Sequence, residues 1–112
     1  MSIGPLPAKA KAFVHARSGG ICEGCEKAEA TEIHHRKFKS RGGTHDVWNL
    51  LHLCGWGNHT GCHGVAHSLE GDLRGWSVNS WADPLTTGFE APDGTMHWLT
   101  PWGRQDTEEI PF

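Results

Sequence analysis

Four cysteine residues fall in two pairs that could together hold one metal ion. Two residues separate Cys22 from Cys25, and seven separate Cys54 from Cys62. Two thiolates at the first spacing can reach one tetrahedral ion, which a distant pair completes. The alternatives are two disulfides, or one thiolate pair with two spare thiols, and a nearby histidine could replace Cys54 or Cys62. We favour a structural zinc, because the two pairs flank a strand-hairpin pattern.

A second group of residues has the composition of a catalytic metal site. Neighbouring residues of a strand point to opposite faces, so His34 and His35 cannot perform the same task. His63 and His67 are four residues apart and would share one face of a helix. A strand histidine with one or two helix histidines leaves coordination positions open, as catalytic sites do. An isolated histidine is usually a surface or core residue, but four at these spacings favour metal binding.

These residues need short elements to position them, and the pattern predicts an α+β fold. Apolar and turn residues predict a helix at 5–18, strands at 33–36 and 47–53, and a helix at 62–74. In the last helix, Leu69 and Leu73 are expected to face the core.

The C-terminal part predicts a tryptophan-rich β extension. A strand is expected around Trp76 to Trp81, and Pro92-Asp93-Gly94 predicts a hairpin turn. Trp48, Trp76 and Trp98 are expected in the core, whereas Trp56 lies in a glycine-containing loop near the histidines. We therefore divide the chain into a core at 1–74, an extension packed on it at 75–103 and a flexible acidic tail at 104–112.

Size and charge limit the class of protein. A chain of 112 residues with 15 glycines can bury only a modest core, which makes a stabilising metal plausible. Residues 1–67 carry eight Lys/Arg and five Asp/Glu, whereas residues 68–112 carry two and eight. The basic half suits a polyanion and the acidic half suits another partner. Without a bilayer-length apolar run or a leader pattern, we expect an intracellular protein.

The motifs together resemble the HNH endonuclease family over residues 12 to about 70. In chain order they are Cys22-x-x-Cys25, Glu32-Ile33-His34-His35-Arg36, Gly42-Gly43-Thr44-His45-Asp46, Asn49-Leu50-Leu51, Cys54 and Cys62-His63. The stretch from Cys54 to His63 is similar to that of small freestanding HNH proteins of phages and prophages.

The resemblance implies a ββα-metal fold (the His-Me finger), built from two strands and a helix around one divalent ion. By position, His34 and His63 match metal ligands, and His67 stands where some members supply a third. His35 matches the general base, and Asn49 matches the residue that bonds backbone across the hairpin and orients the base. The implied activity is hydrolysis of DNA phosphodiester bonds, by nicking or double-strand cutting.

The loop from Cys54 to Cys62 departs from the family pattern by its length. Counting from Asn49 would select Asn58 or His59 as the ligand, whereas the Cys-His pair selects His63. We prefer His63, because a metal-bound cysteine fixes the start of the helix, and keep His59 as the second choice.

The expected chemistry uses His35, with an ordinary pKa, to take a proton from water. Mixed imidazole and water ligation accepts Mg, Mn, Ni or Zn as the catalytic ion. Basic side chains near this site are expected to clamp the phosphates of the nucleic acid. They are Arg17, Arg36, Lys37, Lys39 and Arg41.

Two other functions remain open on the sequence. A non-catalytic zinc-ribbon module that binds nucleic acid or protein would need the cysteines and the basic loop, but neither His35 nor Asn49. An accessory subunit of phage DNA-packaging machinery would use the acidic half for docking, and would act in the cytoplasm of a host bacterium.

Overall fold

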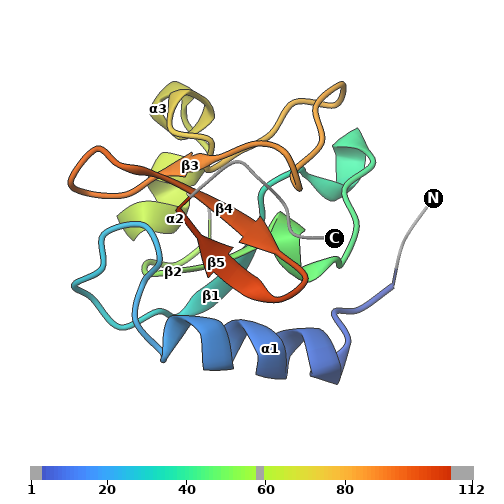
Figure 1. Ribbon diagram of the computed structural model, residues 1–112, viewed down its shortest axis with the longest axis horizontal. Helices are drawn as coiled ribbons and strands as arrows, with labels where there is room; N and C mark the ends of the chain where they lie inside the picture. Colours follow the sequence, from blue (N-terminus) through green and yellow to red (C-terminus); the bar gives the residue numbers. More distant parts are fainter. Residues whose placement is uncertain (1–3, 58–59, 107–112) are drawn as a thin grey trace.

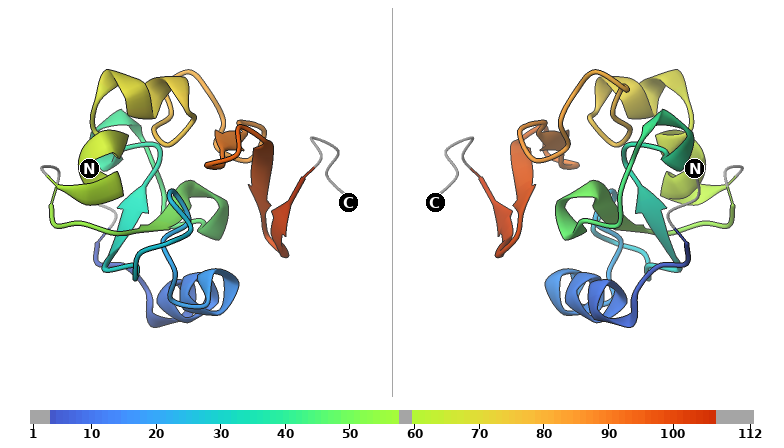
Figure 2. Two further views of the ribbon diagram at one scale, coloured as in Figure 1. Left: turned by 90° about the vertical axis from the view of Figure 1, so that its left-hand side faces the viewer. Right: turned by 90° about the vertical axis from the view of Figure 1, so that its right-hand side faces the viewer.

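The computed structural model describes residues 4–57 and 60–106. Within these residues it has three α-helices and two antiparallel sheets, one of two strands and one of three (Figure 1). Figure 2 shows the three-stranded sheet on one side of the two-stranded hairpin. The α+β fold class expected from the sequence is therefore confirmed.

The hairpin of β1 (Glu32–His35) and β2 (Leu50–Leu53) lies at the centre of the molecule. The sequence predicted that the second strand starts at Val47, but η2 (Val47–Asn49) is a single 3₁₀ turn and pairing begins only at Leu50. A further 3₁₀ turn, η1 (Lys39–Arg41), lies in the connecting loop. Both faces of β2 are buried, whereas β1 is half-buried except at His34.

The first element that covers the hairpin is α1 (Ala8–Ser18), with Pro7 as its N-cap and Gly19 as its C-cap. Gly19 has a φ of 65°, and its N–H donates to the carbonyl of His15. A glycine in the left-handed conformation is a common way to end a right-handed α-helix. Ala10 and Val14 pack against Leu50 of β2. The helix predicted at 5–18 is confirmed from residue 8 onward.

The helix predicted at 62–74 is broken into α2 (Gly61–Ala66) and α3 (Leu69–Leu73). Ser68 has an extended backbone, which changes the direction of the chain. At Gly71, a Cβ would lie 2.5 Å from the carbonyl oxygen of Ala66, so only glycine permits this close approach. The break also overturns a core prediction, because Leu69 and Leu73 are 74% and 77% exposed.

The C-terminal sheet comprises β3 (Phe89–Glu90), β4 (Met96–Thr100) and β5 (Gly103–Gln105). The hairpin predicted at residues 92–94 is confirmed by the pairing of β3 with β4. β5 includes two residues that the sequence analysis assigned to the tail. Residues 107–112 of that tail lie outside the described residues.

The strand predicted around Trp76 to Trp81 is absent from the described part of the chain. Val78 makes a single parallel bridge with Lys37, and Trp81 is 83% exposed. Trp76 is buried, as predicted.

The main core lies between the central hairpin and the C-terminal sheet. Most of its residues come from strands, and one cysteine and one tryptophan pack among them. It consists of Cys22, Leu51, Leu53, Ala66, Trp76, Phe89 and Leu99, with Trp48 packed against its edge. None of the helices in the described part meets the length and hydropathy that a bilayer span requires.

Candidate active site

The four cysteines converge on one point from three elements. Cys22 and Cys25 lie in the turn after α1, Cys54 follows β2, and Cys62 lies in the first turn of α2. Their sulfur atoms all lie within 4.8 Å of one another, and all four thiols are free. The backbone N–H groups of Cys25 and Cys62 donate to the sulfurs of Cys22 and Cys54. This arrangement could hold a metal such as zinc, and it ties the hairpin to α1 and α2.

The electrostatics of the cluster favour thiolate at one position. The thiol of Cys62 donates to Cys22 and lowers the pKa of Cys22 to about 4, whereas the same contact raises the pKa of Cys62. Gly24 lets the first cysteine turn approach the core closely, because a Cβ there would lie 2.9 Å from the Trp76 ring.

Three histidines form a second cluster, whose ligand atoms also lie within 4.8 Å of one another. They are His34 of β1, His63 of α2 and His67, which ends α2. The Nε2 atoms of His63 and His67 are 3.2 Å apart. Two nitrogens at ~2.05 Å from one tetrahedral ion would be ~3.3 Å apart. The spacing therefore suits two ligands of a single cation.

Hydrogen bonds fix which nitrogen each of two rings offers. Nε2 of His34 is 2.8 Å from the carbonyl oxygen of Trp76; a carbonyl only accepts, so Nε2 carries the proton and Nδ1 is free to ligate. Nδ1 of His63 is 2.8 Å from the Glu32 carboxylate, which leaves Nε2 facing His67. A carboxylate behind a ligating histidine is the usual support of a metal site.

The cluster opens into a cavity of about 420 Å³ that His35, Phe38 and Lys39 also line. Phe38 stacks on the His67 ring, with centroids 4.9 Å apart. Burial, together with the neighbouring histidines, lowers the pKa of His34 to about 3. The ring is therefore neutral at neutral pH, the form in which imidazole binds a metal.

His35 lies beside the cluster but makes a different contact. Its Nε2 is 2.9 Å from Nδ1 of His45. Burial, followed by His45 and Lys39, lowers the pKa of His35 to about 4. The ordinary pKa expected from the sequence is therefore wrong. The ring is unprotonated at neutral pH, as a base must be, but it is a weaker base than free imidazole.

Asn49 is buried and ties together the two ends of the loop between the strands. Its Oδ1 accepts from the Lys37 N–H at 2.7 Å, and its Nδ2 donates to the carbonyls of Lys37 and Thr44. These are backbone contacts across the hairpin, of the kind that the family resemblance implied.

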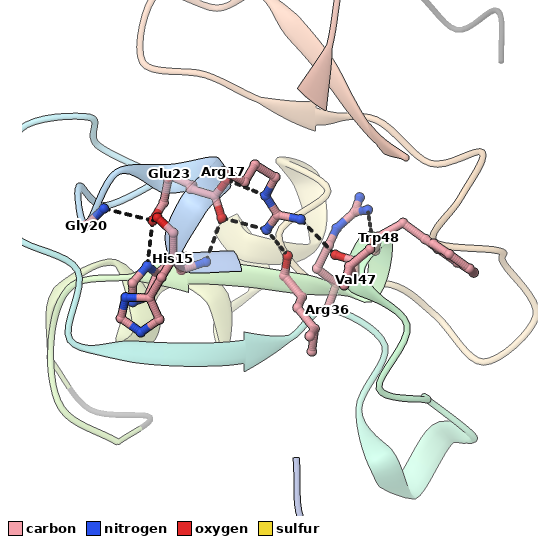
Figure 3. A network of polar contacts seen from close by, with 10 residues as sticks. His15, Arg17, Gly20, Glu23, Arg36, Val47 and Trp48 are labelled. Carbon is pink, nitrogen blue, oxygen red and sulfur yellow. Dashed lines mark hydrogen bonds and ion pairs between the residues drawn. The ribbon is translucent and has the colours of Figure 1, made fainter. Parts of the chain in front are cut away.

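Two of the five expected phosphate contacts are instead internal (Figure 3). Arg17 pairs with the buried Glu23 at 2.7 Å and also donates to the carbonyls of Val47 and Leu50. Arg36 is fully buried, and all of its hydrogen bonds go to backbone carbonyls. Neither guanidinium faces solvent, so the expectation that these arginines clamp a nucleic acid is wrong.

The other three cations differ in their contacts and in their exposure to solvent. Lys37 donates to the carbonyl of Ala82, and Arg41 donates to the carbonyl of Val78 while its guanidinium lies over the Phe38 ring. Lys39 is exposed at the rim of the histidine cavity. Of the five cations, Lys39 is therefore the one whose side chain is exposed beside the cavity.

Sequence reasoning assigned no role to Glu32 or His45. A signal for Glu32 existed: it is two residues before His34, and such residues share a face of a strand. His45 gave no such signal, because its contact with His35 depends on how the loop between the strands folds back. Asn58 and His59 lie outside the described residues, so the geometry bears only on His63. Trp56 is exposed.

Comparison with known proteins gives no match to a family model, to a curated protein or to a solved structure. Any function proposed for this chain therefore rests on its residues and their geometry.

Proposed function

We propose that this protein is a metal-dependent endonuclease of the HNH type that hydrolyses DNA phosphodiester bonds. The observation that carries the proposal is the convergence of His34, His63 and His67 beside a fourth, separately held histidine, His35. A purely structural metal site needs no such neighbour, and it does not need a cavity open to solvent.

The four cysteines would hold a structural zinc, and the three clustered histidines would hold one catalytic divalent ion. That ion would supply Lewis acidity toward the scissile phosphate and the departing oxygen. Three histidines leave coordination positions for water and substrate, which is compatible with Mg, Mn, Ni or Zn.

Residues of the chain itself would transfer the proton, position the loop and contact the phosphate. His35, unprotonated at neutral pH, takes a proton from the attacking water. Asn49 holds the loop that follows the base, and Lys39 contacts a phosphate next to the cut. Such contacts position a duplex without reading its bases, so we expect low sequence specificity.

The test is cleavage of supercoiled plasmid by the purified protein with each of the four ions, beside His35→Ala. The wild type should nick or linearise the plasmid, and His35→Ala should lose activity while keeping its zinc and its melting temperature. A His35→Ala variant as active as wild type would refute the assigned base. Zinc-dependent DNA binding without cleavage under any of the ions would favour the non-catalytic zinc-ribbon alternative. Cleavage only with added packaging proteins would favour an accessory subunit.

A further inference from the structure

His35, the proposed general base, belongs to a series of hydrogen bonds that begins at the backbone carbonyl of Gly4, passes through His45 and ends at the histidine cavity. Nε2 of His45 is 2.9 Å from the carbonyl oxygen of Gly4, and Nδ1 of His45 is 2.9 Å from Nε2 of His35. The two rings are inclined at 57° with centroids 5.1 Å apart, so they meet through their nitrogen atoms and are not stacked.

The Gly4 carbonyl determines which ring nitrogens of His45 and His35 carry protons. A carbonyl oxygen can only accept, so Nε2 of His45 carries a proton and donates it to Gly4. In a neutral His45, Nδ1 is then an acceptor, and Nε2 of His35 must supply the proton between the rings. Neutral His35 is thereby left with an unprotonated Nδ1, and no described residue donates a hydrogen bond to that atom.

We propose that His45 is a positioning residue that fixes His35 in the tautomer whose Nδ1 receives the proton from the attacking water. This inference rests on the proposed function. The proton moves from water to Nδ1, the resulting hydroxide forms a bond to phosphorus, and the leaving oxygen departs with the electron pair of its broken bond and takes a proton from solvent water. The His35 cation keeps donating from Nε2 to a neutral His45, and its Nδ1 proton then returns to solvent.

The same geometry explains how Asn49 can influence a base that it does not touch. Asn49 donates to the carbonyl of Thr44, the residue immediately before His45. The amide therefore fixes the backbone that carries the positioning ring. Gly4 fixes the far side of that ring, which makes the segment before α1 part of the support.

Two near-isosteric substitutions separate the positioning role from simple packing. In His45→Asn, the amide oxygen stands near the place of Nδ1 and can still accept from His35. In His45→Gln, the amide reaches the place of Nε2, where it can contact Gly4 but not His35. His45→Ala removes both contacts. We expect kcat for plasmid cleavage to fall by ~10–100-fold in the Gln and Ala variants and within ~3-fold in the Asn variant, with KM for plasmid nearly unchanged.

A spectroscopic measurement makes the test independent of cleavage. Long-range ¹H–¹⁵N spectra of the zinc-loaded protein should show His35 protonated at Nε2 and unprotonated at Nδ1 in the wild type and in His45→Asn. In His45→Ala the ring should become a mixture of tautomers. A wild-type protein that cuts nothing but has this tautomer pattern would defeat the proposed function and leave the hydrogen-bond assignment intact.

Three results would overturn the inference. They are wild-type kcat in His45→Ala, an Asn variant as impaired as the Ala variant despite a wild-type melting temperature, and a wild-type His35 protonated at Nδ1. Any one of them would show that His45 does not set the tautomer of a catalytic base.

Discussion

Arg36 offers the sharpest test of how the fold supports the site, because it is a fully buried cation whose guanidinium, within the described residues, donates to backbone carbonyls and to no carboxylate. Its guanidinium donates to the carbonyls of Trp48, Gly75, Pro84 and Thr87 at 2.6 to 3.2 Å. Burial lowers its pKa to about 9, so the group is still charged at neutral pH. It thus joins the loop before β2 to the segment between α3 and β3.

The Arg36→Met substitution would leave those four carbonyl oxygens without their donor. Each buried acceptor that stays unsatisfied costs about 1–3 kcal/mol, and carbonyls that can reach water recover most of this. If two of the four carbonyls remain out of reach of water, the loss of unfolding free energy is about 2–6 kcal/mol. A small domain has only about 5–15 kcal/mol in total, so the change should be large.

The assay is urea unfolding of the zinc-loaded protein at a fixed free zinc concentration, followed by tryptophan fluorescence. Lys39→Met is the matched control, because Lys39 carries the same type of charge on an exposed loop, and its stability should change by about 0.5 kcal/mol or less. For equal amounts of folded protein, Lys39→Met should weaken DNA binding more than Arg36→Met does. An Arg36→Met stability within 1 kcal/mol of wild type would refute the reasoning.

Three further outcomes are expected. Cys22→Ser should lose bound zinc and the cooperative thermal melt, which metal analysis and calorimetry would measure; a normal melt would argue against a structural metal. Glu32→Ala should weaken the affinity for the second ion by ~10–100-fold in calorimetric titrations, with the cysteine-bound zinc retained; equal affinity would show that the carboxylate does not support His63. Stability should fall as the pH drops from 6.5 toward 4, because the folded-state pKa values of His34 and His35 lie near 3 and 4, so the unfolded chain binds protons first. Melting temperatures that do not change over that range would contradict this.

Much of the chemistry was already readable from local spacing. The Cys22-x-x-Cys25 turn and the four-residue step from His63 to His67 each bring side chains together within one or two turns of chain. The tight turn at residues 92–94 is local in the same way, and the structure confirms it. Such predictions succeed because backbone geometry alone sets the distances.

Other features did not follow from the apolar pattern. The residue type at Leu69 or Leu73 predicts burial, yet both are exposed, because Ser68 redirects the chain and Gly71 lets α3 approach Ala66 closely. The apolar pattern was a valid helix signal, but it does not show that the extended backbone at Ser68 divides the helix in two and turns its second half.

The sequence alone determined which groups could ligate a metal or accept a proton, because donor chemistry belongs to the side chain. Only the tertiary structure decided which cations face solvent. Arg36 comes directly after β1, and its guanidinium donates to carbonyls of the distant residues Trp48, Gly75, Pro84 and Thr87. The Lys39 side chain, by contrast, is exposed to water. A charge can be buried only where distant segments assemble enough acceptors to replace its hydration, and no local pattern records that assembly.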